Sequence, residues 1–108
     1  MKLLSKEETS TIKEFLKVPI PEYVFSYSDG QIDLFDCYEV AFNFANGLLR
    51  GRKINPNASP WGDSRSVIFE PYYAMLLLNI RNSDLSANIS NYCDLFLKVL
   101  DVFKDHLV

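Results

Sequence analysis

The clearest pattern in this chain lies in residues 84–106, which read DLSANISNYCDLFLKVLDVFKDH. Apolar side chains recur there at alternating steps of four and three residues, which is the spacing of one face of an α-helix. Ser83 is a residue type that caps helix starts, so we expect a helix from Asp84 to His106. The stripe consists of Leu85, Ile89, Tyr92, Phe96, Val99 and Phe103, and Leu95, Val102 and Leu107 widen it.

A second helix is predicted over residues 6–16, near the N-terminus. Ser5 and Glu8 stand three positions apart, the spacing of a capping box in which each side chain bonds the other residue's backbone amide. Pro19 and Pro21 follow, and proline cannot continue a helix. The pattern therefore predicts a short helix with a defined start and a defined stop.

A third helix is predicted from Gln31 to Arg50, with Gly51 as its C-terminal stop. Apolar residues recur in it at three- and four-residue steps, and this long pattern favours the helix over the alternative. The alternative is a short β-hairpin over residues 23–34, turning at Asp29-Gly30, because Tyr23 to Tyr27 has strand propensity.

A fourth helix is predicted from Ser66 or Pro71 to Arg81, after a loop over residues 52–63 that is rich in Pro, Asn, Ser and Gly. With 108 residues, the chain is long enough for one domain with its own core. The predicted fold is therefore mainly α: residues 1–108 form a single-domain bundle of about four helices.

Composition excludes several classes of protein. Hydrophobic residues make up 48% of the chain and charged residues 23%, a balance that excludes a disordered or low-complexity segment. The longest uncharged stretches, 40–49 and 71–80, are half the length of a membrane span, so we expect no membrane partner. Lys6, Glu7 and Glu8 interrupt any apolar secretion signal, which predicts a cytoplasmic protein.

Few residues in the chain are suited to catalysis or metal binding. The single histidine, His106, lies two residues from the C-terminus, and we interpret it as a helix-end cation or a solvated side chain. Cys37 and Cys93 stand 56 positions apart without a C-x-x-C pair, which is typical of buried thiols. Phosphate-binding, dinucleotide-binding and zinc-protease motifs are absent from the sequence. We therefore predict neither catalysis nor a cofactor nor a metal site.

Charge is distributed unevenly along the chain. The net charge is −3, and the pI near 5.0 argues against a nucleic-acid partner. Between Val18 and Leu49 there is no Lys or Arg. The same stretch carries five carboxylates, Glu22, Asp29, Asp33, Asp36 and Glu39.

Two interpretations of these carboxylates remain open. The first is a solvated helix face, since acidic residues near a helix N-terminus are favourable. The second is a docking surface for a cationic protein, where carboxylates steer association and aromatic anchors slow release. Phe44 projects near the polar arc of the predicted helix. Tyr72 and Tyr73 are adjacent, so they cannot both face the interior.

The cations after the acidic stretch, Arg50, Arg52 and Lys53, have two interpretations as well. They complement the negative end of the predicted helix, or they contact an anion. Trp61 covers an edge of the core or protrudes as a contact residue. The sequence does not choose between these alternatives.

In size, acidity, aromatic content and its one-sided acidic segment, the chain resembles bacterial toxin immunity proteins of the contact-dependent growth inhibition or colicin-like type. The resemblance implies direct binding of a cognate toxin domain, often a cationic nuclease, whose activity the protein neutralises. It also implies that the carboxylates stand in for substrate phosphates. With the aromatic anchors included, the predicted partner-binding residues are Glu22, Asp29, Asp33, Asp36, Glu39, Phe44, Tyr72 and Tyr73. Two alternatives remain: a regulatory or scaffold adaptor that binds a partner helix, and a carboxylate-based metal-binding enzyme.

Overall fold

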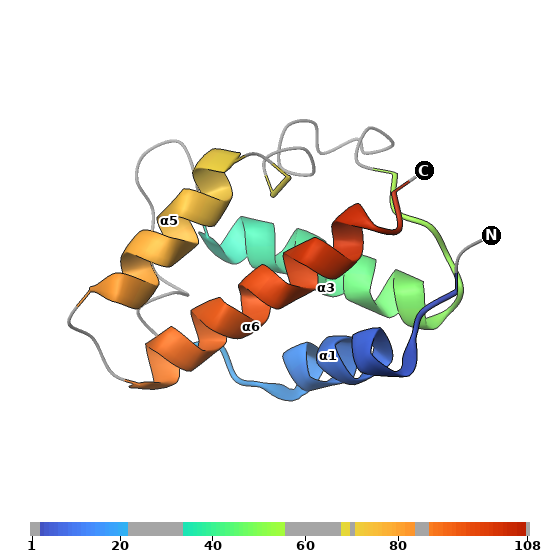
Figure 1. The fold of residues 1–108 in the computed structure, drawn as a ribbon, viewed down its shortest axis with the longest axis horizontal. Coiled ribbons are helices and arrows are strands. Elements are labelled where there is room, and N and C mark those ends of the chain that lie inside the picture. Colours follow the sequence, from blue (N-terminus) through green and yellow to red (C-terminus); the bar gives the residue numbers. More distant parts are fainter. Residues whose placement is uncertain (1–2, 22–33, 56–67, 70, 84–86, 108) are drawn as a thin grey trace.

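The computed structural model describes residues 3–21, 34–55, 68–69, 71–83 and 87–107. These residues contain four α-helices, which confirms the predicted mainly helical bundle (Figure 1). The alternative hairpin lies outside the described residues, apart from Leu34, which is already helical. The helices are α1 (Lys6–Lys17), α3 (Leu34–Leu49), α5 (Pro71–Asn82) and α6 (Ala87–Lys104).

Helix α6 is the centre of the bundle. It contacts each of the other three described helices, and α1 also contacts α3. In Figure 1, α6 crosses in front of α3, with α1 along its lower side and α5 beside its N-terminal half. The molecule is 20 Å across its shortest dimension, about two helix diameters. Each helix therefore buries one face and leaves another at the surface.

The predicted apolar stripe of α6 is confirmed within the described residues. Phe96 is fully buried, and its ring centroid lies 5.1 Å from that of Phe15 and 5.7 Å from that of Tyr73, both in edge-to-face geometry. Leu107 differs from the prediction, since it is 37% exposed beyond the end of the helix. The buried members of the predicted stripe are Ile89, Tyr92, Leu95, Phe96, Val99, Val102 and Phe103.

Helix α1 begins and ends where its sequence predicts. The Glu8 amide donates to the Ser5 hydroxyl at 3.0 Å, and the Ser5 amide donates to the Glu8 carboxylate at 3.0 Å, which completes the capping box. At the other end, Val18 has extended backbone angles. The ring of Pro19 disfavours a helical conformation in the residue before it, which explains the stop.

Helix α3 ends at a glycine, as predicted. Gly51 has a φ of +78°, a conformation that glycine adopts without steric cost. The Gly51 amide donates to the Leu48 carbonyl at 3.0 Å, and the Arg52 amide donates to the Gly47 carbonyl at 2.9 Å. This pair of bonds is the Schellman arrangement, which satisfies the last carbonyls of the helix.

The junction between α5 and α6 is described only in part. Pro71 begins α5, the position where its missing amide hydrogen costs nothing. At the end of α5 the Ser83 hydroxyl donates to the Ile80 carbonyl at 2.6 Å. The predicted role of Ser83 as the cap of the next helix involves residues 84–86, which lie outside the described residues. In the described residues α6 begins at Ala87.

Candidate functional site

Two of the five predicted carboxylates lie in the described residues. Asp36 and Glu39 are both exposed on α3, three positions apart, and therefore project from neighbouring points of one surface. Among the described residues, no cation forms an ion pair with either carboxylate. We call Asp36 and Glu39 the acidic face. The other three, Glu22, Asp29 and Asp33, lie outside the described residues.

The predicted aromatic anchors need correction. Phe44 is 7% exposed because its ring packs against Phe69 and Phe103, with centroid distances of 6.1 and 5.7 Å. Tyr73 is fully buried against Phe96. Neither side chain is available to a partner, so both assignments are wrong. The side chain of Tyr72 lies outside the described set.

The composition of α3 explains why Phe44 was wrongly predicted to contact a partner. Its sequence, LFDCYEVAFNFANGLL, carries apolar residues on most faces, so the periodicity alone does not fix which face is buried. In the bundle the buried face contains Cys37, Ala41, Phe44, Ala45 and Leu48.

The cations that follow α3 are exposed. Arg50, Arg52 and Lys53 all reach the surface at the end of the bundle where the two ends of the chain lie (Figure 1). The amide of Arg52 takes part in the helix stop, and this backbone bond does not distinguish between the two interpretations of its charge. Trp61 lies outside the described residues.

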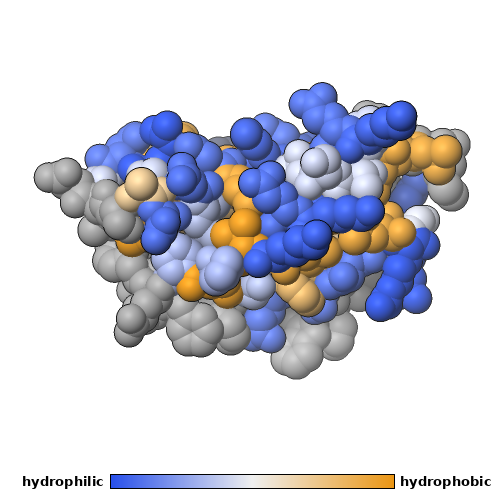
Figure 2. All heavy atoms as spheres, turned by 90° about the horizontal axis from the view of Figure 1, so that it is seen from below, coloured by the Kyte–Doolittle hydropathy of each residue, from blue (hydrophilic) through white to orange (hydrophobic). Residues whose placement is uncertain are grey.

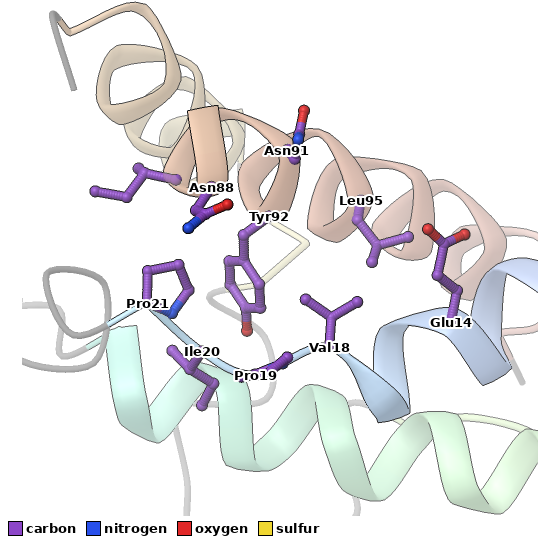
Figure 3. A pocket seen from close by; sticks show the side chains of 10 residues that line it. Glu14, Val18, Pro19, Ile20, Pro21, Asn88, Asn91, Tyr92 and Leu95 are labelled. Atoms are coloured by element: carbon purple, nitrogen blue, oxygen red, sulfur yellow. The ribbon is translucent and has the colours of Figure 1, made fainter. Parts of the chain in front are cut away.

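A groove lies between α1 and α6 (Figure 3). Its volume is about 740 Å³. One wall consists of Glu14 and residues 18–21, and the other consists of α6 residues between Asn88 and Leu95. We call this feature the α1–α6 groove. Figure 2, which looks at the molecule from below Figure 1, shows apolar side chains exposed among hydrophilic ones on this side.

Tyr92 stands in the middle of the α1–α6 groove wall, with its hydroxyl directed toward residues 18–20 (Figure 3). The side chain is 1% exposed, and its hydroxyl has no hydrogen-bond partner among the described residues. Burial raises the pKa of Tyr92, and the neighbouring Tyr38 and Cys93 raise it further. The phenol is therefore neutral at ordinary pH and is not a general base.

The two ends of the described chain are joined by a pair that sequence reasoning missed. His106 is 5% exposed, and its Nε2 lies 3.2 Å from Oε2 of Glu8 on α1. The Ile54 amide also donates to the His106 carbonyl at 3.1 Å. The expectation of a solvated side chain is therefore wrong. The prediction was based on the position of His106 near the C-terminus, where side chains are often mobile. In the structure, the packing of α1 beside α6 buries His106.

The two cysteines are buried thiols outside any disulfide, as predicted. Burial raises the pKa of Cys93 to about 11, with a further contribution from the charge of Asp94 that Arg81 partly opposes. A thiol with this pKa is a poor nucleophile near neutral pH.

Within the described residues, no group of three or more His, Cys, Asp or Glu side chains is arranged to hold a metal ion. None of the helices described in the structure is both long and apolar enough to cross a bilayer. Comparisons of the chain with protein-family models, curated proteins and solved structures find no match.

Proposed function

We propose that this chain is an immunity protein, which binds a cationic toxin domain through the acidic face and neutralises it. The observation that carries the proposal is the exposure of Asp36 and Glu39, side by side on α3, without an ion-pair partner among the described residues. Three further carboxylates, Glu22, Asp29 and Asp33, precede them in a stretch that has no Lys or Arg.

Electrostatics favours a binding role for such a surface. Carboxylates of one sign repel one another mildly along a helix, and surfaces that serve solubility alone tend to mix signs. A patch of one sign attracts an oppositely charged partner and raises the association rate, and high salt removes this effect. Carboxylates also bind the Lys and Arg side chains that a nuclease uses to hold phosphates.

The test is growth rescue. The proposal predicts that the reading frame immediately upstream of this gene encodes a large protein with a basic C-terminal domain, and the probe is that domain, expressed alone or together with the chain. We expect the domain alone to arrest growth and the wild-type chain to restore it. The double variant Asp36→Lys, Glu39→Lys should bind the same domain about tenfold more slowly, within the range of electrostatic steering.

A matched control separates the acidic face from net charge. The double variant Glu7→Lys, Asp101→Lys changes the charge by the same amount at exposed positions of α1 and α6. It should retain rescue and an association rate near that of the wild-type chain. Equal association rates for the two double variants would reject the acidic face as the docking surface.

A second candidate function is an adaptor that binds a partner helix, and one observation favours it. Met75 and Leu78 of α5 are 58% and 42% exposed, and they stand three positions apart on one face. Exposed apolar side chains at this spacing match a helix-in-groove contact. Changing both residues to Glu should abolish binding of an apolar partner helix and leave binding through the acidic face unchanged.

A further inference from the structure

We propose that a pocket beside the C-terminal half of α3 binds a phosphate group. Its volume is about 330 Å³, and its lining includes Asn43, Phe44, Gly47, Arg52, Lys53 and Ile54. We call this feature the Arg52 pocket. The proposal assigns an anion contact to Arg52 and Lys53, and it does not depend on the immunity function.

Backbone bonds hold the segment that carries the two cations on both sides. The Arg52 amide donates to the Gly47 carbonyl at 2.9 Å. The Ile54 amide donates to the His106 carbonyl at 3.1 Å, and the Ile54 side chain is only 2% exposed. Figure 1 shows this segment running from the end of α3 toward the C-terminus. The backbone of Arg52 and Lys53 is therefore fixed before a ligand binds, which lowers the entropy cost of binding.

Gly47 leaves the wall of the pocket open on the side of α3. A Cβ atom at this position would lie 3.8 Å from the Cβ of Arg52, which is ordinary van der Waals contact. A side chain longer than that of alanine would therefore extend into the space beside Arg52. The glycine keeps this space accessible to a ligand.

The charge of the Arg52 pocket is positive. Arg52 and Lys53 are exposed, and among the described residues neither forms an ion pair. The described lining contains no carboxylate. Glu39, one turn before the pocket on α3, and Asp105, directly after α6, lie outside the lining. Two adjacent cations repel each other, and an anion bound between them offsets this repulsion.

The bonds at the end of α3 reduce its repulsion of an anion. A helix C-terminus carries partial negative charge on its last carbonyls. The Gly47 and Leu48 carbonyls already accept backbone amides in the Schellman arrangement. Asn43 lines the pocket more than one turn before this end and is exposed, so its side-chain amide adds a neutral donor.

The donors favour phosphate over a carboxylate. The guanidinium of Arg52 can bind two phosphate oxygens at once, and the ammonium of Lys53 can bind a third. A phosphate group carries a charge of about −1.5 to −2 near neutral pH, which matches two cations, whereas a carboxylate matches one. Phe44 and Ile54 are buried beneath the pocket and offer little surface to a large apolar ligand. The Arg52 pocket therefore suits a compact anion.

The experiment is an NMR titration of the full ¹⁵N-labelled chain with sodium phosphate at about pH 7, where phosphate is mostly dianionic. Sodium chloride keeps the ionic strength constant. We expect saturable shifts at the Asn43 side-chain amide and the Arg52 Nε–H group. The dissociation constant should be about 1 mM, which two charge-assisted hydrogen bonds can supply. Acetate should bind about tenfold more weakly, because it lacks one such bond.

Two variants separate the pocket from net charge. Arg52→Gln should weaken phosphate binding about tenfold, the effect of one lost bond to a charged group. Arg50→Gln is the matched control, since it makes the same charge change at an exposed residue outside the lining. It should change the dissociation constant by less than about twofold, because exposed charges at a distance are screened.

The proposal is overturned if chloride alone produces the same shifts, or if acetate binds as tightly as phosphate. It is also overturned if the two variants weaken binding equally, which would leave only a net-charge effect. Acetyl-phosphoserine-methylamide distinguishes the sources of the phosphate group, and binding of it supports the site in either case. Tighter binding than that of inorganic phosphate would indicate a phosphorylated protein, and weaker binding a free phosphate.

Discussion

The imidazole Nε2 of His106 lies 3.2 Å from a carboxylate oxygen of Glu8, and this contact ties the end of the chain to the start of α1. The other oxygen of Glu8 accepts from the Ser5 amide in the capping box. The Glu8 carboxylate therefore contacts two parts of the fold: the N-terminal cap of α1 and the residues that follow α6. Both side chains are largely shielded from water, with exposures of 4% and 16%.

The variant His106→Ala should destabilise the fold by about 1–3 kcal/mol, because it removes a buried side chain and leaves a carboxylate oxygen without this partner. The measurement is the urea concentration at the unfolding midpoint. Lys104→Ala is the control, since Lys104 is exposed in the last turn of α6. Equal midpoints for the two variants would mean that the contact contributes nothing measurable.

The variant Tyr92→Phe should be at least as stable as the wild-type chain at neutral pH. The hydroxyl that it removes is buried and has no partner among the described residues, so no described hydrogen bond is lost. Most tyrosine hydroxyls in protein cores are bonded, and their removal destabilises. A clear loss of thermal stability would show that this hydroxyl has a partner in the folded protein.

The same variant should change the response to alkaline pH. Burial raises the pKa of Tyr73 and Tyr92 in the folded chain, whereas an unfolded tyrosine ionises near about pH 10. Above that pH the unfolded chain releases protons that the folded chain retains, so stability falls as pH rises. The fall should be shallower for Tyr92→Phe, measured by urea unfolding at pH values on either side of 10. Identical slopes for the two proteins would contradict the raised pKa of Tyr92.

The two thiols should react slowly with a disulfide reagent such as DTNB at about pH 8, because they are buried and the pKa of Cys93 is raised to about 11. Both should react at once in denaturant, where burial is lost. The control is Lys98→Cys, which adds a thiol at an exposed position of α6 and should react rapidly in the folded protein. Fast reaction of the wild-type chain would indicate frequent opening of the core.

Local signals in the sequence explain how well the helix ends were predicted. The capping box of Ser5 and Glu8, the stop at Gly51 and the start at Pro71 each depend on residues a few positions apart. Their energetics are local, so a short window contains the necessary information. The Ser83 hydroxyl also bonds locally, since it donates to the Ile80 carbonyl at the end of the preceding helix.

The candidate sites were predicted less well than the helices. Asp36 and Glu39 are exposed, as the acidic-surface interpretation requires, whereas Phe44 and Tyr73 are buried. Helical periodicity indicates which face of a helix is buried when one face is apolar and the others are polar. It does not indicate the buried face when most faces are apolar. The α1–α6 groove was not predicted, because its two walls are separated in the sequence by more than sixty residues.

The sequence by itself determined the helical class, the bounds of α1 and the buried stripe of α6, since backbone sterics, capping and periodicity act over a few residues. Only the tertiary structure decided which face of α3 is buried, that His106 meets Glu8, and that Asn88 and Asn91 share a groove with Glu14. These outcomes depend on how helices from distant parts of the chain pack, and that packing follows from the shape of the whole core.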